Sequence, residues 1–192
     1  KSLTGIMTKL HQCKYRFGLT GTLDGTQTHQ LVLEGLFGAV EKVTTTKELM
    51  DKKTLANLKI KCIILKHPEI REKMDYVEEL NYIVSNDVRN KFIMDLCRSI
   101  SGNTLCLFQL VEKHGKILYD NMKGSENVYF VYGGTDTEQR EKIRGLVEGH
   151  TNSTTIASYG TFSTGINIRN IHNIVLASPS KSKIRVLQSI GR

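Results

Sequence analysis

The run from Thr104 to Leu110 is almost continuously apolar, which is typical of a strand covered on both faces in a parallel sheet. Three further apolar runs follow it along the chain: one at 128–132, one from Ile156, and one at 173–177. Apolar residues at helical spacing fill the intervals before and between the first three runs, and they predict helices at 86–101, 112–123 and 136–148. Strands that alternate with helices predict an α/β fold with a doubly wound, mostly parallel sheet.

Local signals mark where several elements begin and end. Thr135 and Glu138 have the spacing of a capping box for the last of these helices, and Gly38 is placed to end a helix at 27–37. The charged stretch 69–84 predicts an irregular segment, either a solvated face or a flexible insertion. The other predicted elements are helices at 3–13 and 47–55 and strands at 15–22, 40–43 and 58–65, the last of which Pro68 ends.

The charge balance favours a polyanionic partner. The 192 residues include 27 Lys and Arg against 19 Asp and Glu, a net charge of +8, and such a surplus suits nucleic acid. Solvated lysines that bind nothing explain the same surplus. No apolar run approaches the ~20 residues that a membrane span requires, and no signal-peptide pattern opens the chain, so no membrane partner is expected.

The cysteines and histidines form no recognisable metal or catalytic motif. The four cysteines lack C-x-x-C pairing, so we expect small buried residues of a reducing compartment, with no disulfide and no metal site. These cysteines are Cys13, Cys62, Cys97 and Cys106. His114, His150 and His172 are isolated in the sequence, which favours structural or exposed positions over catalysis.

The last part of the chain combines features that suit a polyanionic ligand. A short strand from Ile156 leads into a polar loop punctuated by glycine, where small hydroxyl residues let backbone N–H groups approach phosphates. After the strand at 173–177, a basic helix predicted from Lys181 carries Gln188 and Arg192, which share one helix face. An arginine there can contact a triphosphate through two parallel hydrogen bonds.

These two segments, Ala157–Ile166 and Lys181–Arg192, resemble motif V and the start of motif VI of superfamily 2 helicases, and most closely the recombination helicases of bacteriophages. Gly18–Thr22 resembles motif III, and Leu105–Gln109 and 133–140 resemble motifs IV and IVa. The resemblance implies a RecA-like P-loop NTPase helicase fold. It also implies that residues 1–55 end a first motor domain and cross over, and that 56–192 form a second motor domain, complete or nearly so.

The resemblance implies a role in ATP chemistry for two groups of residues. In motif III, Thr20, Gly21 and Thr22 would couple ATP hydrolysis to strand movement. The residues facing ATP would be Gly165, Asn167, Gln188 and Arg192, of which Gln188 and Arg192 would be catalytic. Asn167 stands where the family usually has aspartate, so a charge-assisted contact is lost or replaced by a neutral one.

The resemblance also implies the DNA contacts and the biological role. The DNA-binding residues would be Ser158, Tyr159, Thr161, Arg140, Lys181 and Lys183. The activity implied is that of an ATP-dependent DNA helicase or translocase on branched or duplex DNA and on RNA–DNA hybrids. Branch migration, fork regression and R-loop unwinding in phage recombination, repair and replication would be its tasks, in the cytoplasm of the infected host.

The cofactors implied are ATP and Mg²⁺, bound mainly by an upstream domain. The sequence holds neither a G-x-x-x-x-G-K-[ST] loop nor an Asp-Glu pair for magnesium, so the chain alone is not expected to hydrolyse ATP. It opens without Met and stops within motif VI, and we expect both ends to be cuts. The first motor domain would be a partner within the same protein.

Two other functions fit parts of the sequence. A non-catalytic α/β module could bind nucleic acid through the net charge of +8 alone. A Rossmann-like transferase domain would need a glycine-rich turn followed by an acidic residue for the ribose, and the sequence has no such pattern.

Overall fold

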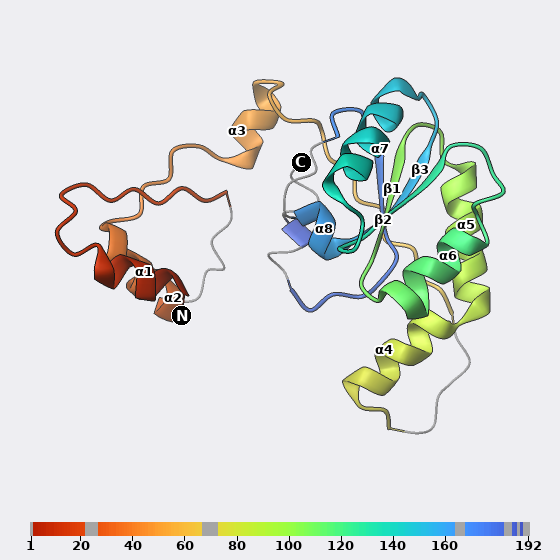
Figure 1. Cartoon of the computed structure of the whole chain (residues 1–192), viewed down its shortest axis with the longest axis horizontal. Helices are drawn as coiled ribbons and strands as arrows, with labels where there is room; N and C mark the ends of the chain where they lie inside the picture. Colours follow the sequence, from red (N-terminus) through yellow and green to blue (C-terminus); the bar gives the residue numbers. More distant parts are fainter. Residues whose placement is uncertain are drawn as a thin grey trace. The chain divides into compact units, whose positions relative to one another are not determined.

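The computed structural model describes residues 2–21, 27–66, 73–163, 168–182, 186–187 and 189. The chain divides into two compact units, Lys1–Lys66 and His67–Arg192, which run from red to orange and from yellow to blue in Figure 1. The boundary expected after residue 55 falls inside the first unit.

The second unit is built on a parallel sheet. Within the described residues four strands lie in the order β2-β3-β1-β4, and each neighbouring pair is parallel. The strands are β1 (Thr104–Phe108), β2 (Val128–Val131), β3 (Thr154–Ser158) and β4 (Asn173–Leu176). Every residue of β1 and β3 is buried. The predicted α/β fold with a parallel sheet is confirmed.

Helices cover both faces of this sheet, as Figure 1 shows for α7 on one side and α5 and α6 on the other. The helices are α4 (Tyr76–Ser85), α5 (Asp87–Ser99), the π-helix η1 (Val111–Gly115), α6 (Lys116–Asp120), α7 (Thr137–Gly149) and α8 (Tyr159–Ser163). Successive side chains of β1 point to opposite faces. Leu105 and Leu107 join the cluster under α7, while Cys106 and Phe108 join the cluster under α5 and α6.

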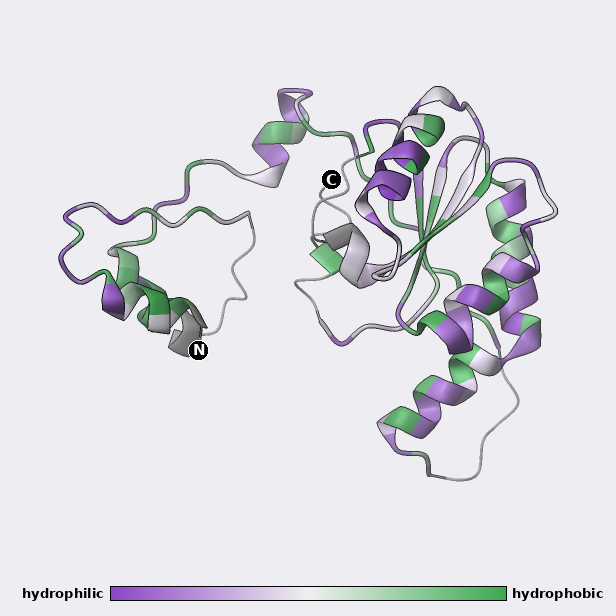
Figure 2. Ribbon diagram, viewed as in Figure 1, coloured by the Kyte–Doolittle hydropathy of each residue, from purple (hydrophilic) through white to green (hydrophobic). Residues whose placement is uncertain are grey.

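Two predictions about helix starts are wrong. Asp75 and Glu78 form a capping box that begins α4 inside the stretch expected to be irregular. Figure 2 shows the alternating purple and green of this amphipathic helix. The helix buries Leu80 and Val84. At α7 the cap is Asp136, which accepts the backbone N–H of Gln139 at 2.7 Å. The hydroxyl of Thr135 instead accepts the backbone N–H of Tyr132, so the expected Thr135 capping box is absent.

Two further segments differ from their predicted form. The helix expected at 112–123 is divided into η1 and α6 at Gly115, where a Cβ would lie 2.4 Å from the buried ring of Phe108. A side chain here would displace that ring, so the close packing of η1 requires glycine. Directly after β3, the expected polar loop begins as the short helix α8.

The first unit contains α1 (Ser2–Lys9), α2 (Gln27–Phe37) and α3 (Thr46–Asp51). Gly38, with φ of 94°, ends α2 as predicted. The segments 15–21, 40–43 and 58–65 are not strands, contrary to prediction. A strand needs a neighbour for its backbone hydrogen bonds, and no described segment of this unit pairs with them. Their apolar side chains are exposed, among them Phe17, Val43 and Ile64.

The cysteines divide equally between the interior and the surface. Cys97 and Cys106 are buried as expected, but Cys13 and Cys62 are exposed, so the prediction of burial is wrong for these two. All four are free thiols. Among the described residues, no helix combines the length and the apolar character needed to cross a membrane.

Candidate functional site

The carboxyl edge of the sheet gathers the residues that follow each strand. Because all pairings are parallel, Gln109 after β1, Tyr132 after β2, Tyr159 after β3 and Ala177 after β4 lie at the same edge. Ligands of open α/β sheets collect at this edge. Several of the predicted site residues therefore come together here.

Ser158 and Thr161, both predicted to contact DNA, lie side by side where β3 ends and α8 begins. Their hydroxyl oxygens are 2.7 Å apart, and the backbone N–H of Thr161 donates to Ser158 Oγ at 3.4 Å. Both side chains are buried, so their hydroxyls serve first to hold the turn into α8. A contact with a ligand here would be made mainly by the backbone.

The side chain of Tyr159 lies inside the protein with only 1% of its surface exposed. Its hydroxyl donates to the carbonyl oxygen of Ser178 at 2.9 Å, and its ring packs in the cluster under α7. A direct contact between this side chain and DNA would require the ring to leave the core. The geometry therefore favours a structural link between the exits of β3 and β4.

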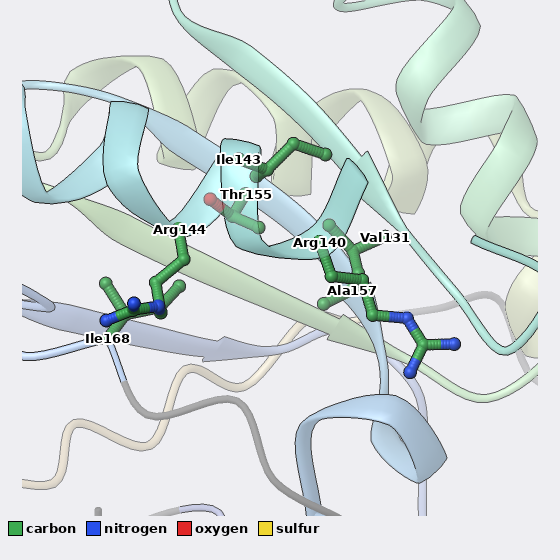
Figure 3. Close-up of a pocket in the computed structure, with 7 residues that line it drawn as sticks. All are labelled: Val131, Arg140, Ile143, Arg144, Thr155, Ala157 and Ile168. Carbon is green, nitrogen blue, oxygen red and sulfur yellow. The ribbon is translucent and has the colours of Figure 1, made fainter. Parts of the chain in front are cut away.

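Arg140 reaches the same edge from α7. Its Nη2 donates to the carbonyl oxygen of Gly133 at 3.0 Å, and its buried Nε has no hydrogen-bond partner among the described residues. Figure 3 shows the guanidinium beyond Ala157, on the side of α8. The cavity that Arg140 lines is about 10 Å³, room for about one water molecule and far too small for a nucleotide.

Lys181 lies in the segment after β4. Its Nζ is 3.5 Å from the centre of the Tyr76 ring at the start of α4. An ammonium over an aromatic face is a cation–π contact, worth about 0.5–1 kcal/mol at an exposed site. The contact holds Lys181 on the surface of this unit, with its side chain exposed.

A buried hydrogen-bond network lies behind these residues. His114 Nδ1 is 2.8 Å from Ser178 Oγ, and His114 Nε2 is 3.1 Å from Asn90 Oδ1. The amide nitrogen of Asn90 donates to the carbonyl oxygen of Val84 at 2.8 Å, which leaves Asn90 Oδ1 as the acceptor facing the ring. His114 therefore carries its proton on Nε2 and accepts the Ser178 hydroxyl at Nδ1.

Burial, together with the positive charge of Arg89, lowers the pKa of His114 to about 4. The ring is thus neutral near pH 7, in agreement with the network. His114 is a buried structural residue, as predicted. Its partner Ser178 lies 64 residues away in the sequence. No local pattern could have joined Asn90, His114 and Ser178, because their contacts exist only after folding.

Because of His114, the free energy of unfolding is expected to fall as the pH is lowered. The unfolded chain takes up a proton near pH 6.5 and the native ring only near pH 4, so between these values the unfolded state binds more protons and stability rises with pH, by up to about 1.4 kcal/mol per unit. Urea unfolding of wild type and His114→Gln, compared at about pH 7 and about pH 5, measures this contribution. An identical pH dependence in the two proteins would contradict it.

The other predicted site residues are not described at this edge of the sheet. Thr20 and Gly21 are exposed residues of the first unit. Outside the described residues lie Thr22, Gly165, Asn167, Lys183, Gln188 and Arg192. The roles given to all these residues stay predictions.

Comparison with known proteins agrees with the resemblance seen in the sequence. Residues 86–192 match the family model described as the helicase conserved C-terminal domain. Over 200 residues the whole chain is 38% identical to the "ATP-dependent DNA helicase uvsW" of Enterobacteria phage T4, and it spans 40% of the length of that protein. No solved structure matches the chain. The predicted resemblance is confirmed, and the chain belongs to the helicase conserved C-terminal domain family.

Proposed function

We propose that this chain is the carboxy-terminal part of an ATP-dependent DNA helicase or translocase. The observation that carries the proposal is the 38% identity of the whole chain to an ATP-dependent DNA helicase. Residues 1–55 are assigned to the end of the first motor domain and the crossover, and 56–192 to the second motor domain. The parallel sheet, with polar residues gathered at its carboxyl edge, supports this assignment.

The substrate proposed is DNA, branched or duplex, with RNA–DNA hybrids as a further substrate. The name of the phage relative supports DNA as the polymer, and the net charge of +8 supports a polyanion. Branch migration, fork regression and R-loop unwinding during phage recombination, repair and replication are the proposed tasks, in the cytoplasm of the infected host.

The proposed DNA contacts lie around α8 and the segment after β4. Ser158, Tyr159 and Thr161 contribute through the backbone, since their side chains are buried. Arg140, Lys181 and Lys183 contribute positive charge for phosphates. Because these contacts read the backbone of DNA rather than its bases, they would position the strand without selecting a sequence.

The proposed nucleotide contacts come from Gly165, Asn167, Gln188 and Arg192, while Thr20, Gly21 and Thr22 couple hydrolysis to strand movement. ATP when bound supplies the energy for movement, and its transferred phosphoryl group would be met by Arg192. The phosphate-binding loop and the Mg²⁺ ligands are assigned to the first motor domain, because this sequence has neither motif. The chain alone is therefore proposed not to hydrolyse ATP.

An ATPase assay of the intact protein, with and without forked DNA, tests the proposal. DNA-stimulated turnover by the intact protein and none by this chain alone is the expected result. Absence of stimulated turnover in the intact protein would leave a non-catalytic nucleic-acid module as the function.

Removing the positive charge after β4 is expected to weaken DNA binding. The change is Lys181→Ala, Lys183→Ala and Arg185→Ala together in the intact protein. If all three residues contact phosphates, the slope of log K against log salt becomes shallower by about two to three units, and affinity at low salt falls at least about tenfold. Titration of forked DNA at several salt concentrations measures both.

The matched control removes three exposed charges from α5 and the α6 region, with Lys91, Lys116 and Lys123 changed to alanine. This control should keep the salt slope close to wild type. Equal weakening by both triple variants would show that only net charge matters and would contradict the placement of DNA after β4.

A further inference from the structure

Ser178 is the point at which the exits of three strands meet. Its Oγ accepts the backbone N–H of Gln109, the residue after β1, at 3.1 Å. Its carbonyl oxygen accepts the hydroxyl of Tyr159, the residue after β3. Ser178 itself comes shortly after β4 and is buried. One serine therefore links the segments that follow β1, β3 and β4.

Helix α5 holds the same segment from the other side. Arg89 Nη2 donates to the carbonyl oxygen of Ala177 at 2.6 Å, and Asn90 supports the ring of His114, which contacts Ser178 Oγ. The consecutive carbonyls of Ala177 and Ser178 are thus held from α5 and from the start of α8. The segment after β4 has a position that depends on these few buried hydrogen bonds.

We propose that Tyr159, His114 and Ser178 are positioning residues that couple α8 to the segment after β4. The proposal rests on the proposed function, in which α8 lies at the DNA and the segment after β4 leads to Gln188 and Arg192 at the nucleotide. A shift of α8 caused by DNA pulls on Ser178 through the Tyr159 hydroxyl, and so reaches the nucleotide side. None of the three side chains needs to touch a ligand.

These hydrogen bonds control the position of loops more than the integrity of the sheet. The sheet is held by three parallel strand pairings and two apolar clusters, which do not require the hydroxyls of Tyr159 and Ser178. Helix α8 has only 5 residues, so few contacts of its own fix its place. Loss of either hydroxyl leaves a buried polar group unpaired, and the loops adjust while the sheet persists.

The control for this proposal is Ser153, a buried serine of the same unit at the opposite edge of the sheet. Ser153 Oγ donates to Asn103 Oδ1 at 2.7 Å, so Ser153→Ala also removes one buried hydroxyl and its hydrogen bond. It touches neither α8 nor the segment after β4. A role in stability alone would make Ser153→Ala and Ser178→Ala equivalent.

Hydrogen exchange of this chain tests the physical link. Tyr159→Phe is expected to speed exchange about tenfold in both 159–163 and 178–182, because it removes the hydrogen bond that joins the two segments. Ser178→Ala keeps that bond, which the Ser178 carbonyl oxygen accepts, but it removes the Oγ contacts with Gln109 and His114 that hold this carbonyl in place. The same acceleration is therefore expected in both segments. Ser153→Ala should leave these two segments at the wild-type rate. Faster exchange confined to the substituted segment, or the same acceleration in Ser153→Ala, would overturn the proposal.

Strand separation by the full-length protein tests the consequence. The number of base pairs separated per ATP hydrolysed is expected to fall about tenfold in Ser178→Ala and in Tyr159→Phe, the effect of about 1.4 kcal/mol, and to stay at the wild-type value in Ser153→Ala. A wild-type ratio in both site variants would overturn the proposal. A full-length wild type without DNA-stimulated ATPase would refute the proposed function instead, and the exchange rates would still decide whether the two segments are linked.

Discussion

Arg192→Ala in the intact protein is expected to lower DNA-stimulated ATP turnover at least about a hundredfold, or roughly 3 kcal/mol of transition-state stabilisation. The planar guanidinium can meet the charge that spreads over the transferred phosphoryl group through two hydrogen bonds. An arginine that merely ends a helix would contribute only about 0.3–1 kcal/mol to stability through the helix dipole. The size of the loss therefore separates the two roles.

The matched control for Arg192 is Arg98→Ala. Arg98 is an exposed arginine of α5 that pairs with Asp95 and donates to the carbonyl oxygen of Asn121. This variant should keep turnover close to wild type. Steady-state ATPase assays with saturating forked DNA, alongside thermal melts of each protein, give the measurement. Retained turnover in Arg192→Ala, with an unchanged melt, would place Arg192 on the surface and remove it from the nucleotide site.

The sheet could be predicted because its strands carry a strong local signal. A run such as Thr104–Phe108 is buried on both faces, so nearly every residue is apolar and the strand stands out without any neighbour. The apolar residues at helical spacing in α5 predicted its first and last residues to within two positions. In these elements the residues that the fold buries are also the apolar residues of the sequence. The local sequence pattern was therefore enough to predict them.

Prediction failed where local chemistry allowed two outcomes. Asp75 and Glu78 have the spacing of a capping box, yet the charge of this stretch suggested a solvated segment. Burial of Leu80 and Val84 stabilises the helix. Thr135 and Asp136 are both good cap residues. Asp136 caps α7 because the Thr135 hydroxyl accepts the backbone N–H of Tyr132, a choice set by the turn after β2.

The candidate site was only partly visible in the sequence. Ser158 and Thr161 were predicted from a local motif, and in the structure their hydroxyl oxygens are 2.7 Å apart; their contact with DNA stays a prediction. The motif could not reveal that the side chain of Tyr159 turns inward, because that depends on Ser178, 19 residues away. Arg89 and His114 carry no local signal at all, since their partners are distant in the sequence or belong to other elements of the second unit.

Asn103 occupies the opposite, amino edge of the sheet and is fully buried. Three carbonyl oxygens lie within hydrogen-bond distance of its amide nitrogen and share its two N–H groups, and its Oδ1 accepts the hydroxyl of Ser153. The three carbonyls belong to Val147 at 3.0 Å, His150 at 2.7 Å and Asn170 at 2.9 Å. One side chain therefore joins the end of α7, the approach to β3 and the approach to β4.

Asn103→Ala is expected to lower the free energy of unfolding by about 4 kcal/mol, because it leaves several buried polar groups unpaired at about 1–3 kcal/mol each, with partial relaxation, and opens a cavity. The melting temperature should fall by about 10 °C, as urea and thermal unfolding followed by circular dichroism would measure.

Asn121→Ala is the control: it removes the same kind of bond, to the carbonyl oxygen of Ile117 at 2.8 Å, from an exposed position. There water replaces the lost partner, so the change should stay within about 0.5 kcal/mol. Similar losses in the two variants would mean that the buried network at the amino edge contributes no more than a surface hydrogen bond.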